Sequence, residues 1–303
     1  MILLLFTFVG LTTGLVFNIT EDAEPKHLLG FINGPSTSTD INYLIVYPDN
    51  ATENALRVDE KTGELNVIGI LDYETRKRYE ILAVPLNGGE GIQITVNVLD
   101  VNDNSPVFPR SMITLELSEV ARKGFLLALP SAEDSDSPPF DVQSYSILRG
   151  NVNNVFRLQT RRVEGQLVSS LQVNGPLDRE YKESYELIVE ARDGGEPPRT
   201  AELTVRILLL DVNDNAPKFN QVNYSLTINS NTTMNQPILN VSATDIDAGD
   251  NARVTYRLAS IRSDYDARFS LTPNGSLYPT GTIPPGKLTA GLYRMEVVAA
   301  DGG

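Results

Sequence analysis

The sequence predicts an all-β protein built as a linear array of sandwich domains. Segments such as 92–98 (IQITVNV) and 201–207 (AELTVRI) alternate apolar and polar residues, a period that is typical of half-buried strands. Asn-Gly, Gly-Gly and Pro-Pro pairs interrupt these segments, as turns between strands require. The octapeptide LDVNDNSP from Leu99 recurs as LDVNDNAP from Leu210, which indicates that a domain-sized unit repeats.

We expect three units of about 100 residues, the usual size of one sandwich. Their expected boundaries are 15–107, 108–218 and 219–303, with the third unit truncated at its carboxyl-terminal end. Other motifs recur in the same order: LDYE matches LDRE, AEDSD matches ATDID, and RDGGEP matches the final ADGG. The chain is therefore expected to be the amino-terminal piece of a longer protein.

The first residues predict a secretory signal peptide over 1–14. The run MILLLFTFVG is apolar but too short to span a bilayer. No basic residue precedes it, so a buried first strand is the alternative. Extracellular exposure fits six N-x-Ser/Thr sequons, which begin at Asn18, Asn50, Asn223, Asn231, Asn240 and Asn274. No later stretch approaches the roughly 20 apolar residues of a membrane helix, so we expect any membrane anchor to lie beyond residue 303.

Composition excludes several functions. A net charge of −14 and a pI near 4.6 argue against nucleic acid and anionic membrane surfaces as partners. The absence of cysteine removes disulfides, thiolate metal sites and cysteine nucleophiles. A hydrolase with paired carboxylates is the enzyme alternative, but the acids recur at two places, and neither a nucleophile elbow nor a phosphate-binding glycine loop is present. His27 is the one histidine and is expected at the surface. The sequence predicts that the protein is not an enzyme.

Acidic residues gather around the first boundary. Two carboxylates about 4 Å apart repel by about 4 kcal/mol at an effective dielectric near 20, so a converged cluster needs a cation. Oxygen ligands without cysteine favour calcium over zinc. The local stretch DIDAGDN imitates an EF-hand, but Asp250 stands where that loop needs glycine and Tyr256 where it needs glutamate. The ligands must therefore come from residues distant in sequence.

These motifs together resemble those of the cadherins, over nearly the whole chain after residue 20. The resemblance implies tandem seven-stranded Greek-key (Ig-like) sandwiches and about three Ca²⁺ ions at each of two complete junctions. For the first junction it implies an outermost ion held by Glu21, Asp72, Glu74 and Asp103, a middle ion held by Glu21, Glu74, Asp100, Asp103, Asp136 and the Val101 carbonyl, and a third held by Asn102, Asp134, Asp136, Asp193 and the carbonyls of Asn104 and Phe140.

The second junction is expected to repeat this set. The resemblance implies side-chain ligands from Glu119, Asp178, Glu180, Asp211, Asn213, Asp214, Asp245, Asp247 and Asp301, with the carbonyls of Val212, Asn215 and Asn251. Within each linker we expect the aspartates to face the preceding repeat and Asn102 or Asn213 to reach the next one. In the third repeat Ser230 replaces the Glu119 position and TIPPGK near Thr282 replaces LDRE, so a calcium-poor bend is expected after it.

The absence of tryptophan excludes adhesion by exchange of an amino-terminal Trp-bearing strand. The first repeat looks more like the non-classical cadherins, Dachsous and Fat, or like protocadherins. The resemblance implies calcium-dependent cell–cell adhesion at the extracellular face of the cell membrane, with another cadherin on an apposed cell as partner, homophilic or heterophilic, a Fat-like protein being one candidate. A passive extracellular spacer or force-bearing tether is the alternative.

Overall fold

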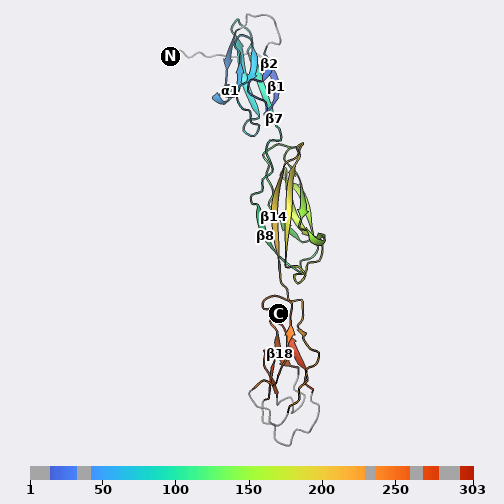
Figure 1. Ribbon diagram of the computed structural model, residues 1–303. Helices are drawn as coiled ribbons and strands as arrows, with labels where there is room; N and C mark the ends of the chain where they lie inside the picture. Colours follow the sequence, from blue (N-terminus) through green and yellow to red (C-terminus); the bar gives the residue numbers. More distant parts are fainter. Residues whose placement is uncertain (1–13, 33–41, 229–235, 260–268, 280–293) are drawn as a thin grey trace, which may run out of the picture.

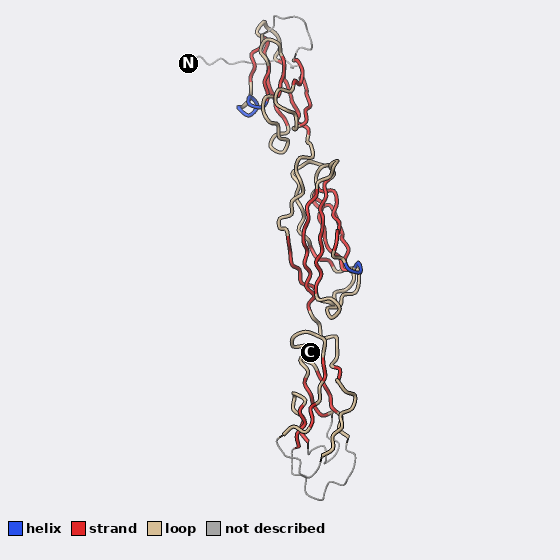
Figure 2. Tube along the Cα trace, viewed as in Figure 1, coloured by secondary structure: helices blue, strands red, loops and turns tan. Residues whose placement is uncertain are grey.

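The computed structural model describes residues 14–32, 42–228, 236–259, 269–279 and 294–303, which form three β units placed end to end (Figure 1). Strands run roughly along the long axis of each unit, and a short linker joins each unit to the next (Figure 2). The all-β expectation is confirmed. The predicted signal peptide lies outside the described residues except for Gly14, which is the first residue of strand β1.

The first unit is a sandwich of a four-stranded sheet, in the order β1-β7-β6-β3, and a three-stranded sheet, β2-β5-β4. Strand β1 forms one edge of the first sheet and pairs in parallel with β7, with Ile19 opposite Val98. Helix α1 (Asn50–Ala55) begins at Asp49, which accepts a hydrogen bond from the Thr52 N–H. The strands are β1 (Gly14–Thr20), β2 (Leu28–Phe31), β3 (Tyr43–Val46), β4 (Leu56–Val58), β5 (Glu64–Val67), β6 (Arg78–Pro85) and β7 (Ile92–Leu99).

The second unit repeats this topology. Its sheets have the orders β10-β13-β14-β8 and β11-β12-β9, and β8 pairs with β14 in parallel. The strands are β8 (Met112–Ser118), β9 (Leu126–Ala128), β10 (Val142–Arg149), β11 (Phe156–Val163), β12 (Gln166–Val173), β13 (Ser184–Asp193) and β14 (Thr200–Leu210), with a 3-10 turn η1 (Val152–Asn154) before β11. Both segments with alternating polarity, 92–98 and 201–207, lie inside strands, as predicted.

The described part of the third unit contains three small sheets, β15-β17, β16-β20-β19 and β18-β21. Its strands are β15 (Lys218–Phe219), β16 (Leu239–Asn240), β17 (Ala243–Thr244), β18 (Thr255–Leu258), β19 (Phe269–Leu271), β20 (Ser276–Pro279) and β21 (Val297–Ala300). The segments with Ser230 and Thr282, on which the expected calcium-poor bend rests, lie outside the described residues.

The first two units have separate hydrophobic cores. Leu65 and Ile94 belong to the first core, and Phe156 and Leu187 to the second, where Phe156 meets Tyr185 edge to face at 5.2 Å. Because successive side chains of a strand point to opposite faces of the sheet, every second residue fills the space between the two sheets and the others face solvent. Each sandwich therefore has its own core, and polar residues at the sandwich ends meet at the junctions.

Candidate metal centre

A buried glutamate fixes the end of each sandwich to the linker that follows. Glu21 is 5% exposed, and its carboxylate accepts hydrogen bonds from the Tyr73 N–H at 2.6 Å and the Val101 N–H at 2.9 Å. Glu119 does the same in the second repeat, with Arg179 N–H and Val212 N–H each at 2.8 Å. The LDYE or LDRE turn and the linker are therefore held around one carboxylate.

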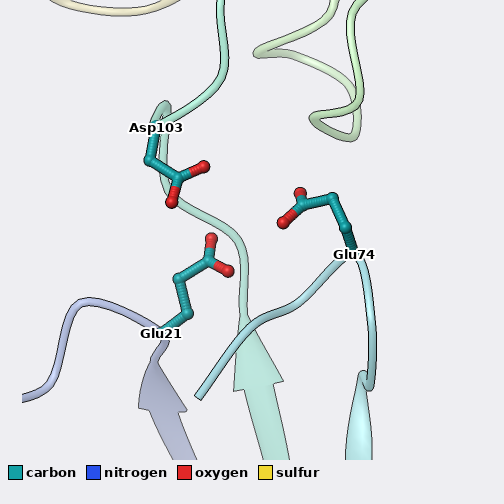
Figure 3. Close-up of side chains that lie close together, drawn as sticks. All are labelled: Glu21, Glu74 and Asp103. Carbon is teal, nitrogen blue, oxygen red and sulfur yellow. The ribbon is translucent and has the colours of Figure 1, made fainter. Parts of the chain in front are cut away.

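Four groups of carboxylates gather at the two junctions. Within each group one oxygen per residue lies within 4.8 Å of the others. Figure 3 shows one group, in which the side chains of Glu21, Glu74 and Asp103 point into a common space. The groups are Glu21, Glu74 and Asp103; Glu74, Asp100 and Asp136; Glu119, Glu180 and Asp214; and Glu180, Asp211 and Asp247. The second pair of groups repeats the first at matching positions, and each pair combines one repeat, the linker and the next repeat.

The second asparagine of each linker joins linker to repeat. The Asn104 side-chain amide donates to Asp103 at 2.8 Å and to Asp136 at 2.7 Å. Asn215 makes the same two bonds, to Asp214 at 2.8 Å and to Asp247 at 2.7 Å. The predicted calcium ligands of Asn104 and Asn215 are their backbone carbonyl oxygens. The bonds described here use the side-chain amides instead.

The first asparagine of each linker reaches the next repeat, as expected. Asn102 donates to the Pro197 carbonyl at 3.4 Å, and Asn213 donates to Asp301 at 2.8 Å. The glycines of the DGG motif make room for this contact: a Cβ on Gly195 would lie 1.8 Å from the Asn102 amide nitrogen, and one on Gly303 would lie 1.6 Å from that of Asn213. The glycines of this motif therefore allow the linker asparagine to approach closely, in addition to the role of the aspartate.

One expectation about the linkers is wrong. Asp100 and Asp211 do not face only the preceding repeat, because each accepts hydrogen bonds from the next one. Asp100 accepts from the Ser137 N–H at 2.6 Å and from the Ser137 hydroxyl, while Asp211 accepts from the Ala248 N–H at 2.9 Å and the Asn251 amide at 2.8 Å. Each linker aspartate therefore turns at least one oxygen toward N–H donors of the next repeat, while the second oxygen of Asp211 also accepts from Arg179 of the preceding repeat.

Crowding of the carboxylates alters their protonation. Burial, together with the negative charges of Glu21, Asp100 and Asp103, raises the pKa of Glu74 to about 7. Burial also raises the pKa values of Glu21, Asp134 and Asp136, with neighbouring carboxylates adding to the effect. These shifts mark a site in which negative charge is poorly compensated by the protein itself.

Orphaned oxygens test whether a cation fits this donor set. Of the six buried side-chain polar atoms without a hydrogen-bond partner among the described residues, five belong to predicted ligands. They are Asp100 Oδ1, Asn102 Oδ1, Asp134 Oδ2, Asp193 Oδ2 and Asp245 Oδ2. An unpartnered buried oxygen costs about 1–3 kcal/mol, and a hard cation that takes carboxylate and carbonyl ligands removes that cost. The residues present fit calcium.

Several predicted ligands lie outside the four carboxylate groups. Asp72 and Asp178 accept hydrogen bonds from Thr75 and Tyr181 in their own turns, at 2.9 and 2.8 Å between the carboxylate oxygen and the backbone nitrogen. Asp193 accepts from the Arg199 N–H at 2.9 Å. The Val101 carbonyl accepts from the Asp103 N–H at 2.8 Å. The other predicted ligands outside the groups are Asn102, Asn104, Asp134, Phe140, Val212, Asn213, Asn215, Asp245, Asn251 and Asp301.

Two residues of the junctions were missed from the sequence. Ser137 supplies the donor to Asp100 that Asn251 supplies to Asp211, and it compensates for Phe140 at the Asn251 position. The sequence contains a clue to this role, because the two repeats differ at both positions together: Ser137 aligns with Ala248, and Phe140 aligns with Asn251. Arg179, inside LDRE, places its guanidinium among the acids of the second junction. The clue in the sequence was the difference between the two motifs at this position, where LDYE has Tyr73.

Comparison with known proteins agrees with this geometry. Residues 113–210 match the cadherin domain family. The chain is 36% identical over 301 residues to Protein dachsous of Drosophila melanogaster, an alignment that covers 94% of this chain and 8% of that protein. The chain belongs to the cadherin superfamily. Human Protocadherin-16 is 34% identical over 273 residues, covering 88% of this chain and 8% of that protein.

A solved cadherin structure shares the three-unit arrangement. The EC1-3 structure of a mouse clustered protocadherin, PcdhgC3, superposes with a TM-score of 0.82 at 29% identity and covers 95% of both chains. This cadherin chain spans only 8% of the length of Protein dachsous or Protocadherin-16. These relatives are cadherins and protocadherins, not enzymes, so the hydrolase alternative is excluded. Within the described part of the chain, no helix is long and apolar enough to cross a membrane.

Proposed function

We propose that this chain is the adhesive extracellular region of a non-classical cadherin, whose junctions are made rigid by calcium. The observation that carries the proposal is the repeated carboxylate group at each junction, built from one repeat, the linker and the next repeat. Acids shared between two bodies repel unless a cation joins them, so bending at the junction depends on calcium.

The residues that would hold calcium are those predicted from the sequence. In the first junction they are Glu21, Asp72, Glu74, Asp100, Asn102, Asp103, Asp134, Asp136 and Asp193 with the carbonyls of Val101, Asn104 and Phe140; in the second they are Glu119, Asp178, Glu180, Asp211, Asn213, Asp214, Asp245, Asp247 and Asp301 with the carbonyls of Val212, Asn215 and Asn251. When bound, about three ions per junction would supply the positive charge that these oxygens lack.

Stiff junctions fix the angles between successive repeats, and hence the orientation of any surface that they present. Extracellular calcium modules have dissociation constants of about 10⁻⁴ to 10⁻³ M, so extracellular calcium would load the sites while its removal would empty them. Glu21 and Glu119 bond directly to backbone donors of the linker, so we expect each sandwich to stay folded when calcium is removed.

The proposed partner is another cadherin on an apposed cell, homophilic or heterophilic. We place the repeats at 15–107, 108–218 and 219–303, at the extracellular face of a cell membrane, with the anchor in a part of the protein outside this sequence. The described sequon asparagines Asn18, Asn50, Asn223, Asn240 and Asn274 are all exposed, which fits glycosylation. Similarity to Protein dachsous and the protocadherins supports this proposal.

Beads coated with the full chain test adhesion directly. We expect them to aggregate in about 1–2 mM calcium, alone or with beads carrying a Fat-like cadherin, and to disperse in chelator. Absence of aggregation with every cadherin partner, while calcium still narrows the shape distribution in solution scattering, would favour the passive spacer instead. Absence of both effects would contradict the proposed function.

A further inference from the structure

The second junction contains a cation of its own, the guanidinium of Arg179. This side chain is 11% exposed and bonds to the carboxylates of Glu180 and Asp211. It also donates to the Ile246 carbonyl at 3.0 Å. Glu180 belongs to the second repeat, Asp211 to the linker and Ile246 to the third repeat, so one side chain connects all three.

Among the described residues, the first junction lacks an equivalent connection: its guanidinium, that of Arg199 in the second repeat, donates to the Asp103 carbonyl of the linker and pairs with no carboxylate. Tyr73 occupies the position of Arg179, and its backbone N–H bonds to Glu21 as that of Arg179 bonds to Glu119. Its ring stays with its own repeat, where the Lys77 ammonium lies 4.5 Å from the ring centre. The two turns therefore make the same backbone hydrogen bond, but the Tyr73 side chain stays with its own repeat and the Arg179 side chain contacts the linker and the next repeat.

The difference is visible at a single pair of equivalent atoms. Asp100 Oδ1 is buried and has no hydrogen-bond partner in the described part of the chain, whereas Asp211 Oδ1 accepts from Arg179 Nε. The other oxygen of each aspartate bonds to the next repeat in both junctions. Glu180 and Asp211 also belong to one carboxylate group with Asp247, so the guanidinium uses oxygens that the proposed calcium site needs.

We propose that Arg179 is an internal counter-cation, which holds the second junction in shape when calcium is low and must leave Glu180 and Asp211 when calcium binds. The proposal rests on the proposed function for its calcium step only. A guanidinium keeps its charge at all physiological pH values and forms several directed hydrogen bonds, so it joins acids without a metal. The two junctions would then differ: the first is loose without calcium and binds it readily, and the second is ordered without calcium and needs more of it.

Distances between spin labels can measure each junction separately, because the chain has no cysteine of its own. Gln93→Cys with Glu186→Cys spans the first junction, and Glu186→Cys with Arg257→Cys spans the second; all three positions are exposed. In chelator we expect a narrower distance distribution at the second junction. Calcium added at constant ionic strength should narrow each distribution, with a higher midpoint at the second junction.

Arg179→Tyr and the reciprocal Tyr73→Arg are the matched variants. Arg179→Tyr should broaden the second distribution in chelator about twofold and lower its calcium midpoint about tenfold, the scale on which charged hydrogen bonds contribute. Tyr73→Arg should shift the first junction in the opposite direction. Arg179→Met keeps a flexible, unbranched side chain without the charge, so it replaces Arg179→Tyr if that variant does not fold.

An unchanged width in chelator and an unchanged midpoint in the Arg179 variants would overturn the proposal. If calcium narrows neither junction of the unaltered chain, the proposed calcium function fails instead. In that case the width in chelator still decides the role of Arg179: broadening in Arg179→Tyr or Arg179→Met supports it, and no broadening overturns it.

Discussion

The carboxylate of Glu21 accepts a hydrogen bond from the backbone N–H of Val101 at 2.9 Å, so the end of the first sandwich is fixed to the linker without any metal. Its other oxygen accepts from the Tyr73 N–H at 2.6 Å. This glutamate thus has a structural role in addition to its proposed role as a calcium ligand. The two roles are separable, because hydrogen bonding to the backbone persists in chelator.

Glu21→Ala should destabilise the first repeat even in chelator. The substitution leaves two backbone N–H groups without their acceptor, at about 1–3 kcal/mol each when they are buried, so we expect a loss of about 2–6 kcal/mol. Urea unfolding of the full chain in chelator measures it. Glu24→Ala, the same truncation at an exposed position, should change stability by less than about 0.5 kcal/mol. Equal effects of the two substitutions would contradict this role of Glu21.

Gly195→Ala should disturb the first junction and leave the second unchanged. The added Cβ would lie 1.8 Å from the Asn102 amide nitrogen, so Asn102 must leave its contact with the second repeat. We expect a broader shape distribution in solution scattering at millimolar calcium and a higher calcium midpoint for the first junction. Glu90→Gln is the control, since it changes an exposed side chain away from the junctions. A first junction indistinguishable from that of the control would show that Asn102 is unimportant.

Asp103→Ala should loosen one junction while both sandwiches stay folded. Asp103 is an exposed member of the group with Glu21 and Glu74, so its removal costs calcium binding rather than core packing. In calcium, solution scattering should show a bent population that the unaltered chain lacks, whereas in chelator the free energies of unfolding should change by less than about 0.5 kcal/mol. Glu90→Gln, the loss of one exposed charge away from the junctions, should leave the shape unchanged. Asp214→Ala should act in the same way at the second junction.

Much of this architecture was accessible from the sequence because the signals are periodic. Alternation placed the strands that contain 92–98 and 201–207, since a strand buries every second residue. Repetition placed the acidic motifs at the ends of the units, but only the resemblance to the cadherins implied that Glu74, Asp100 and Asp136 share a site, and the structure brings these three carboxylates together.

Side-chain direction was not accessible in the same way. Whether Asp100 faces backward or forward depends on the nearest donor, Ser137, whose position is set by the fold of the next repeat. The place of Arg179 depends equally on tertiary structure, since a long side chain can turn toward solvent or toward Asp211. Matching LDYE with LDRE by their shared acids draws no attention to the residue between the acids, and this residue, Tyr73 or Arg179, is the one that differs between the junctions.

The cap of helix α1 gives a pH dependence that is independent of calcium. Asp49 accepts from the Thr52 N–H at 2.7 Å and pairs with Arg76 at 3.0 Å. The Arg76 guanidinium, followed by the bonds from Thr52, holds the pKa of Asp49 well below its usual 3.8. A lowered folded-state pKa means that the charged carboxylate stabilises the first repeat fully above pH 3.8, and that this contribution declines as the pH falls below that value.

Asp49→Asn separates the charge from the cap, because asparagine can still accept from the helix N–H. We expect the variant to unfold at lower urea than the unaltered chain at pH 6, and the difference to shrink progressively below pH 3.8. The comparison is made in chelator at each pH, so titration of the junction carboxylates affects both proteins equally and cancels. Glu90→Gln is the control, with no expected difference of this kind. A difference that stays constant from pH 6 to pH 3 would mean that the Arg76 pair contributes nothing and that only the shape of the cap matters.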